Sequence, residues 1–141
     1  MLASLLLLLP LVPFGVKLRS KVNSPPTQEQ LEVPVKAVEY LKAKQITGNT
    51  LTEPNIWGGY LIWELPSNPV YIDGRGLYPE PFVKEYVGII LGVTDWHVPF
   101  DRYGVRIVIV GPNSSLSRQL KNSPDWQQVY QDEMSLVFTK R

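Results

Sequence analysis

The sequence contains no cysteine, a single histidine and only 19% charged residues among its 141 positions. Without cysteine, disulfide bonds, thiolate metal sites and cysteine nucleophiles are excluded. A zinc site would have to use carboxylates around His97, so we interpret this histidine as an ordinary surface residue. No Gly-x-Ser-x-Gly motif is present, and a hydrolase triad therefore has no support. We expect no cofactor and no metal site.

The basic residues are unevenly distributed. Lys17, Arg19 and Lys21 all precede the first acidic residue, Glu29, and the rest of the chain has 11 basic and 13 acidic residues. That remainder is mildly acidic and has no basic stripe, whereas nucleic acid binding requires clustered lysine and arginine to contact phosphates. We therefore expect no binding to nucleic acid.

Residues 2–16 are almost entirely apolar but are interrupted by Pro10 and Pro13. A helix of this length covers about 22 Å, which is less than the roughly 30 Å hydrocarbon core of a bilayer. Basic residues follow the apolar run instead of preceding it, unlike in a signal peptide. We interpret residues 1–19 as a truncated transmembrane or membrane-anchoring segment, with an apolar arm packed on its own domain as the alternative.

Residues 20–32 form a polar linker in this interpretation, and residues 33–141 form a soluble α/β domain. Apolar spacing and turn residues predict helices at 34–44, 56–65 and around 82–90, a short helix after Thr94-Asp95 that Pro99 interrupts, and a helix from Ser114 or Ser115 to Leu120. Strands are predicted at 50–52, 70–72 and 106–110, followed by a hairpin of 126–131 and 134–139. This order predicts a small three-layer α/β sandwich with a mixed, mostly parallel sheet and a C-terminal antiparallel hairpin.

The predicted helix at 56–65 contains two adjacent glycines. Asn55 is positioned to cap its first turn, while Gly58 and Gly59 would each cost about 1 kcal/mol relative to alanine. We favour close approach of a neighbouring backbone as the reason for them. The alternative is room for a ligand beside Trp57 and Tyr60.

Asp73 and Arg75 flank a glycine just after a predicted strand, at the sheet edge where open α/β sheets bind ligands. Their side chains could form an ion pair or bind a polar ligand such as a sugar hydroxyl or a phosphate. We favour a structural alternative, in which Asp73 accepts backbone amides of its loop and Arg75 pairs elsewhere, with Glu53, Glu80 or Asp101.

The stretches Trp57-Gly58-Gly59-Tyr60-Leu61-Ile62-Trp63 and Ile72-Asp73-Gly74-Arg75 resemble the C-terminal soluble domain of bacterial multispanning membrane proteins of the glycosyltransferase C superfamily, akin to protein O-mannosyltransferases. The resemblance extends from about Pro34 to the end of the chain. It implies an extracytoplasmic domain that follows a bundle of membrane helices. It also implies that the catalytic acid and the site for the lipid-linked donor lie in other parts of the parent protein.

The three basic residues after the apolar run would favour a cytoplasmic domain by the positive-inside rule, but we follow the resemblance and expect an extracytoplasmic one. The membrane is then a partner through the N-terminal segment, and a saccharide or peptide acceptor is the candidate ligand. The chain itself would be a non-catalytic appendage that aids acceptor binding or protein contact. Its candidate ligand-binding residues are Asp73, Arg75, Trp57 and Tyr60, with no catalytic residue.

Two alternatives remain. A small independent enzyme would bring Asp73, Arg75, His97 and Asp101 into one pocket at the sheet edge, since His97 and Asp101 have a spacing that pairs an imidazole with a carboxylate on a helix. A purely structural interaction module would instead have an exposed apolar patch.

Overall fold

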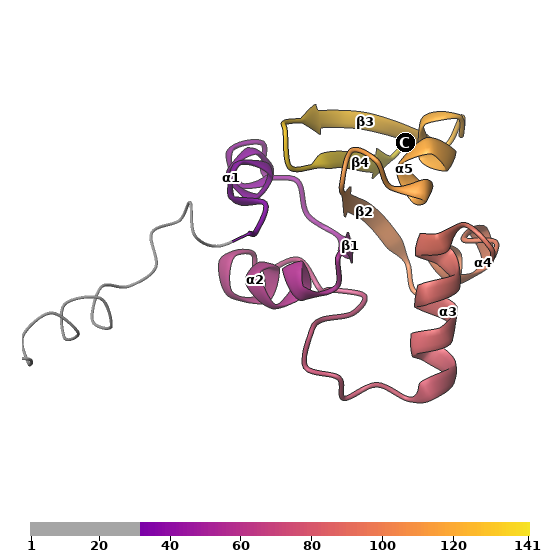
Figure 1. Cartoon of the computed structure of the whole chain (residues 1–141). Helices are drawn as coiled ribbons and strands as arrows, with labels where there is room; N and C mark the ends of the chain where they lie inside the picture. Colours follow the sequence, from indigo (N-terminus) through magenta and orange to yellow (C-terminus); the bar gives the residue numbers. More distant parts are fainter. Residues whose placement is uncertain (1–31) are drawn as a thin grey trace, which may run out of the picture. The chain divides into compact units, whose positions relative to one another are not determined.

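A computed structural model describes residues 32–141, and the predicted anchoring segment, with all of the linker except Glu32, lies outside the described residues. The described residues form a mixed α/β fold (Figure 1). Its helices are α1 (Val35–Ala43), α2 (Ile56–Glu64), α3 (Glu80–Leu91), α4 (His97–Arg102) and α5 (Ser115–Lys121). Its strands are β1 (Asn49–Glu53), β2 (Val105–Val110), β3 (Trp126–Gln131) and β4 (Leu136–Lys140). Between residues 32 and 141, no helix combines the length and the apolar character that crossing a membrane requires.

The four strands form one mixed sheet in the order β1-β2-β4-β3. Strands β1 and β2 are parallel, whereas β2 and β4, and β3 and β4, are antiparallel. The prediction of a mostly parallel sheet is therefore not met, because the C-terminal hairpin supplies two of the four strands. The predicted strand 70–72 is reduced to one parallel bridge between Val70 and Thr50 at the edge of the sheet.

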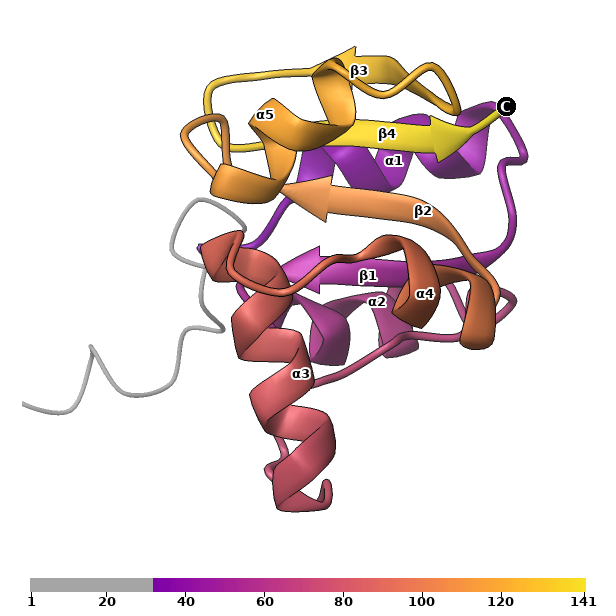
Figure 2. The same cartoon turned by 90° about the vertical axis from the view of Figure 1, so that its right-hand side faces the viewer.

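Strand β2 lies at the centre of the sheet and separates two apolar cores. Ile107 and Ile109 belong to a core that also contains buried side chains of α1 and α2, such as Leu41 and Leu61. Its other face contributes Val108 and Val110 to a second core, which contains Ile89 of α3, Phe100 of α4 and Leu116 of α5. We call these the α1–α2 core and the α3–α5 core. Figure 2 shows α3, α4 and α5 in front of the strands, with α1 and α2 behind them.

The two glycines of α2 have different surroundings. A Cβ atom on Gly58 would lie 2.2 Å from the carbonyl oxygen of Ile72 and 3.1 Å from Cα of Asp73, whereas a Cβ on Gly59 would meet no atom of the described residues within 4 Å. The expected close approach of a neighbouring backbone is thus confirmed for Gly58. Gly59 faces open space, and close packing does not explain it.

The helix boundaries agree with the predicted ones more closely than the caps do. Ser114 caps α5, since its Oγ accepts the amide hydrogen of Ser117, as expected. Asn55 precedes α2 but makes no side-chain cap, because its amide instead points to the carbonyl of Asp73. The short helix predicted after Thr94-Asp95 is the six-residue α4, and Pro99 does not interrupt it, because Pro99 lies in the first turn, where its missing N–H costs no helical hydrogen bond.

Candidate functional site

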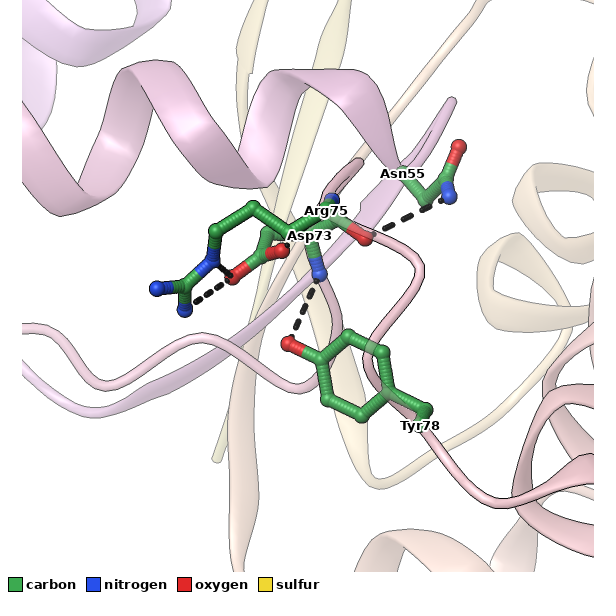
Figure 3. A network of polar contacts seen from close by, with 4 residues as sticks. All are labelled: Asn55, Asp73, Arg75 and Tyr78. Carbon is green, nitrogen blue, oxygen red and sulfur yellow. Dashed lines mark hydrogen bonds and ion pairs between the residues drawn. The ribbon is translucent and has the colours of Figure 1, made fainter.

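The segment after Val70 brings Asp73 and Arg75 together at the start of α2 (Figure 3). The Asp73 side chain is fully buried, while the Arg75 side chain is 68% exposed. Nε and Nη2 of Arg75 lie 2.9 and 2.6 Å from Oδ2 of Asp73. The backbone N–H of Arg75 donates to Oδ1 at 2.9 Å. Asp73 therefore closes its own loop and pairs with Arg75, so the other partners considered for Arg75 are not used.

This arrangement favours the ionised form of Asp73. The hydrogen bond from the Arg75 guanidinium, together with that from its backbone amide, lowers the pKa of Asp73 to about 2 even though burial acts in the opposite direction. A buried carboxylate with so low a pKa remains charged throughout the physiological range. It cannot serve as a proton donor there.

Two further residues hold the backbone of Asp73. Its N–H donates to the hydroxyl of Tyr78 at 3.2 Å, and the side-chain amide of Asn55 lies 3.5 Å from its carbonyl oxygen. Figure 3 shows both side chains directed at the Asp73 backbone from opposite sides. The loop is therefore fixed by its own side chain, by the residue before α2 and by a tyrosine further along the chain.

The ring of Tyr78 also lines a pocket of about 430 Å³. Half of the residues that line this pocket are aromatic: Tyr71, Tyr78, Phe82 and Tyr103. The remaining lining residues are Asn49, Pro69, Val70 and Pro79. Phe82 stacks on Tyr78 and Tyr71, with ring centroids 5.4 and 4.9 Å apart, and Tyr103 meets Tyr71 edge-on at 5.1 Å. The aromatic walls thus support one another as a continuous cluster.

Polar contacts fix the walls of this pocket from behind. The Tyr71 hydroxyl donates to Oε1 of Glu85 at 3.1 Å, and Arg102 binds the other oxygen of the same carboxylate at 3.0 Å. Burial, followed by this hydrogen bond, raises the pKa of Tyr71. The side-chain amide of Asn49, which also lines the pocket, donates to the carbonyl of Tyr103 at 2.7 Å. Within the described part of the chain, the Asn49 side-chain oxygen and second N–H have no other partner and can bind one.

The other two candidate residues lie on the α1–α2 side of the sheet. Trp57 is only 5% exposed, and its indole N–H donates to the carbonyl of Glu32 at 2.8 Å. Tyr60 is half-buried and packs against the α1–α2 core. Burial raises the pKa of its hydroxyl. Neither residue lines the aromatic pocket.

His97 and Asp101 belong to contacts of their own. His97 Nδ1 lies 2.6 Å from Asp95, and Asp101 binds Lys140 at 2.7 Å. Lys140 ends β4, which runs antiparallel to β2, so this ion pair lies at the amino end of β2. Asp73 follows the bridge that runs parallel to β1 and lies near its carboxyl end. No hydrogen bond between described residues joins the His97–Asp101 region to the Asp73–Arg75 pair.

A further polar contact lies at the carboxyl ends of β1 and β2. The Ser114 hydroxyl donates to the carboxylate of Glu53, and burial raises the pKa of Glu53. The sequence indicated Ser114 as a cap but gave no reason to pair it with a residue in a distant strand. Since Ser114 also caps α5, this contact ties that helix to β1.

Sequence reasoning missed the aromatic pocket. Its residues come from the start of β1, the bridge segment, the loop before α3, α3 itself and the loop after α4, and no local spacing brings these together. The usable signal was the number of tyrosines, 7 in the whole chain, but such residues are more often core anchors than binding residues.

Scans of this chain against protein-family models, curated proteins and solved structures found no match.

Proposed function

We propose that this chain is a membrane-tethered, non-catalytic accessory domain of a glycosyltransferase C-like membrane protein, and that it binds a saccharide acceptor in its aromatic pocket. The observation that carries the proposal is the direct link between the pocket and the Asp73–Arg75 loop. Tyr78 forms that link, because its ring lines the pocket while its hydroxyl accepts the amide hydrogen of Asp73.

The composition of the pocket favours a saccharide. Aromatic rings present flat apolar faces on which the C–H face of a sugar ring can stack, while an amide at the rim can bind hydroxyl groups. Tyr103, which is 38% exposed, offers the accessible ring, whereas Tyr71 and Phe82 form the stacked wall behind it. Among the described residues, the side chain of Asn49 has one hydrogen-bond partner, the carbonyl of Tyr103, and can bind a sugar hydroxyl with its remaining donor and acceptor. The volume of about 430 Å³ is within the usual range for small-ligand sites.

The state of Asp73 supports a binding role over catalysis. Both of its oxygens accept hydrogen bonds from Arg75, and the side chain is fully buried. A general acid or base needs an accessible oxygen and a pKa near the working pH, whereas this carboxylate has neither. The pair therefore fits a structural support for the loop beside the pocket.

The remaining parts of the proposal concern architecture and location. Helices on both faces of the sheet support a three-layer sandwich. An extracytoplasmic location and a membrane-embedded parent protein rest on the resemblance of residues 57–63 and 72–75, together with the apolar residues 2–16. A bound peptide acceptor is an outcome that the test below distinguishes from a saccharide.

The test is an NMR titration of the isotope-labelled chain in detergent micelles with methyl α-mannoside, cellobiose and a serine-rich peptide. We expect saturable shifts at the side-chain amide of Asn49 and the backbone amides of Val70 and Tyr103 with a sugar. Replacement Tyr103→Leu removes one exposed aromatic wall and should weaken binding about fivefold, since a stacking contact is worth on the order of 1 kcal/mol.

Tyr40→Leu on α1 is the matched control, because Tyr40 packs on Tyr130 and does not line the pocket. It should leave the affinity unchanged. Saturable shifts with the peptide alone would replace the saccharide by a peptide acceptor. Absence of saturable shifts with all three probes would refute the pocket as an acceptor site.

A further inference from the structure

Helix α2 is apolar on the side that faces solvent as well as on the side that faces the core. Trp57, Gly58 and Leu61 are buried. Ile56 and Trp63 are 63% and 83% exposed, although removing a large apolar side chain from water lowers the free energy. These two residues are seven positions apart and therefore lie on the same side of the helix. Gly59 lies between them along the helix, and a Cβ atom there would have no neighbour in residues 32–141 within 4 Å.

The chain enters the described domain at this same helix. The carbonyl of Glu32, the first described residue, accepts the indole N–H of Trp57, and Val33 packs against the α1–α2 core. Whatever precedes Glu32 is therefore attached to the domain beside α2. Residues 2–16 are the apolar run, and residues 17–31 separate them from this attachment point.

The separating segment is short enough to keep the domain close to an anchor. A segment of this length reaches at most about 50 Å even when fully extended. Lys17, Arg19 and Lys21 lie at its beginning and suit the anionic headgroups of a bilayer. A membrane anchor formed by residues 2–16 would keep the attachment point beside α2 within this distance of the lipid surface, at a high effective concentration.

We propose that the exposed side of α2, formed by Ile56, Gly59 and Trp63, rests on the headgroup region of the bilayer that holds the chain. Tryptophan is enriched at this depth because its ring is apolar while its N–H can still bond to water or headgroups. The inference rests on the membrane tether of the proposed function, but not on the saccharide pocket.

Arg75 extends the same surface. A Cβ atom on Gly74 would lie 3.5 Å from Cα of Ile56, so the loop that carries Arg75 borders the first turn of α2. The guanidinium uses Nε and Nη2 for Asp73 and has further donors for a lipid phosphate. Phosphate binding there needs no break in the ion pair.

A second set of exposed apolar side chains provides an internal comparison. It lies on or next to α3 and α4, which cover the other face of the sheet, and consists of Val87, Leu91, Val93 and Val98. This set is on the side of the sheet opposite the chain entry at Glu32. It should remain in water when the chain is membrane-bound.

Trp63 is a built-in probe for the test, because the other three tryptophans are 3–5% exposed. The full chain is incorporated into vesicles of phosphatidylcholine and phosphatidylglycerol, and the emission of the Trp63→Phe variant is subtracted to isolate Trp63. We expect a blue-shifted Trp63 emission, an acrylamide quenching constant at least threefold lower than in detergent-free solution, and quenching by lipids brominated near the headgroup. The control is a Val98→Trp variant in the Trp63→Phe background, whose added tryptophan should stay accessible to acrylamide.

The outcomes separate this inference from the proposed function. Flotation of the chain with vesicles while Trp63 remains accessible would overturn the lipid contact and leave the tether intact. Failure to float would overturn both. Equal protection of Trp63 from acrylamide with and without vesicles would indicate contact between copies of the chain and would also overturn the lipid contact. Sugar binding to the pocket is measured independently in the NMR titration.

Discussion

Asp73 is a fully buried carboxylate whose partner, Arg75, is mostly exposed to solvent. Burial alone would raise the pKa of a carboxyl group, so the low value near 2 reflects hydrogen bonds that outweigh desolvation. Removal of the partner would leave an unpaired buried charge, which is more costly than absence of the pair. The loop from Ile72 to Arg75 therefore depends on ionised Asp73.

Asp73→Asn should change how stability depends on pH. A folded-state pKa below the usual value means that Asp73 contributes its full stabilisation above about pH 4 and loses it as the pH falls towards about 2. At pH 6 the variant should have a free energy of unfolding about 1–2 kcal/mol lower than that of the parent chain. This range is smaller than the pKa shift alone would give, because solvent screens the exposed guanidinium of Arg75. The difference should shrink by pH 2.5. Urea unfolding at both pH values measures it.

Asp101→Asn serves as the comparison, because Asp101 pairs with Lys140 on the surface, where its side chain is 70% exposed. It should change stability far less at either pH. A pH-independent difference between the Asp73→Asn variant and the parent chain would contradict the role assigned to the ionised carboxylate.

Thr52 is a second residue whose environment makes a measurable prediction. Its hydroxyl is buried and has no hydrogen-bond partner among residues 32–141, whereas the hydroxyl of Thr50 donates to the carbonyl of Gly48 at 3.0 Å. Thr52→Val keeps the shape and removes an unsatisfied polar atom, so it should raise the unfolding free energy by about 1 kcal/mol. Thr50→Val should lower it by a similar amount. Thermal unfolding measures both, and equal effects of the two substitutions would refute the distinction.

For single residues, the sequence predicted which side chains could form ion pairs or hydrogen bonds better than it predicted the partners of those side chains. The Gly74 spacer indicated that Asp73 and Arg75 could meet, and an ion pair was among the alternatives. The orphaned hydroxyl of Thr52 and the link from Tyr78 to Asp73 could not be predicted. Both depend on how β1 and the loop after Val70 pack against distant residues, which no local pattern encodes.

Among the elements, α2 depends most on a single missing side chain. Gly58→Ala would place a methyl group 2.2 Å from the Ile72 carbonyl, and the helix or the Asp73 loop must then shift. We expect a loss of stability of about 2–3 kcal/mol, as for other overpacked sites. Gly59→Ala meets no atom and should gain up to about 1 kcal/mol from helix propensity.

Chemical denaturation of the two alanine variants measures this difference, and amide shifts of Asp73 and Gly74 report whether the loop moves. Since both substitutions add the same methyl group to the same helix, a similar effect on stability would contradict the close packing of α2 on the loop.

Sequence patterns located elements where local signals were strong. The Ser114 cap and the apolar run of β2 are encoded within a few residues, and both were predicted within one residue of their positions. The strand expected at 70–72 has a strand-like composition, but pairing depends on a neighbour and only Val70 forms a bridge. The prediction of a mostly parallel sheet was not met for the same reason, because the alternation of helices and strands along the chain does not show that β4 of the hairpin pairs with β2.

For the whole domain, β2 joins the two cores. Its alternating side chains enter both, with Ile109 in the α1–α2 core and Val108 in the α3–α5 core, and it pairs with β1 on one side and β4 on the other. Because β2 contributes buried side chains to both cores, we expect that loss of packing in one core displaces β2 and disrupts the other core as well. The domain should therefore unfold as one cooperative unit.

Tryptophans on both sides of the sheet test this directly. Trp57 reports on the α1–α2 core, and Trp96 and Trp126 report on the α3–α5 core. Variants that retain only Trp57 or only Trp96, with the other tryptophans replaced by phenylalanine, each report on one core. In each background, Ile109→Val and Ile89→Val delete one methylene from the α1–α2 core and the α3–α5 core, respectively, and should each lower stability by about 0.5–1.5 kcal/mol. Each substitution should shift the urea midpoint seen by both probes equally, because both cores depend on β2. A substitution that shifts only the probe in its own core would show that the two sides of the sheet unfold separately.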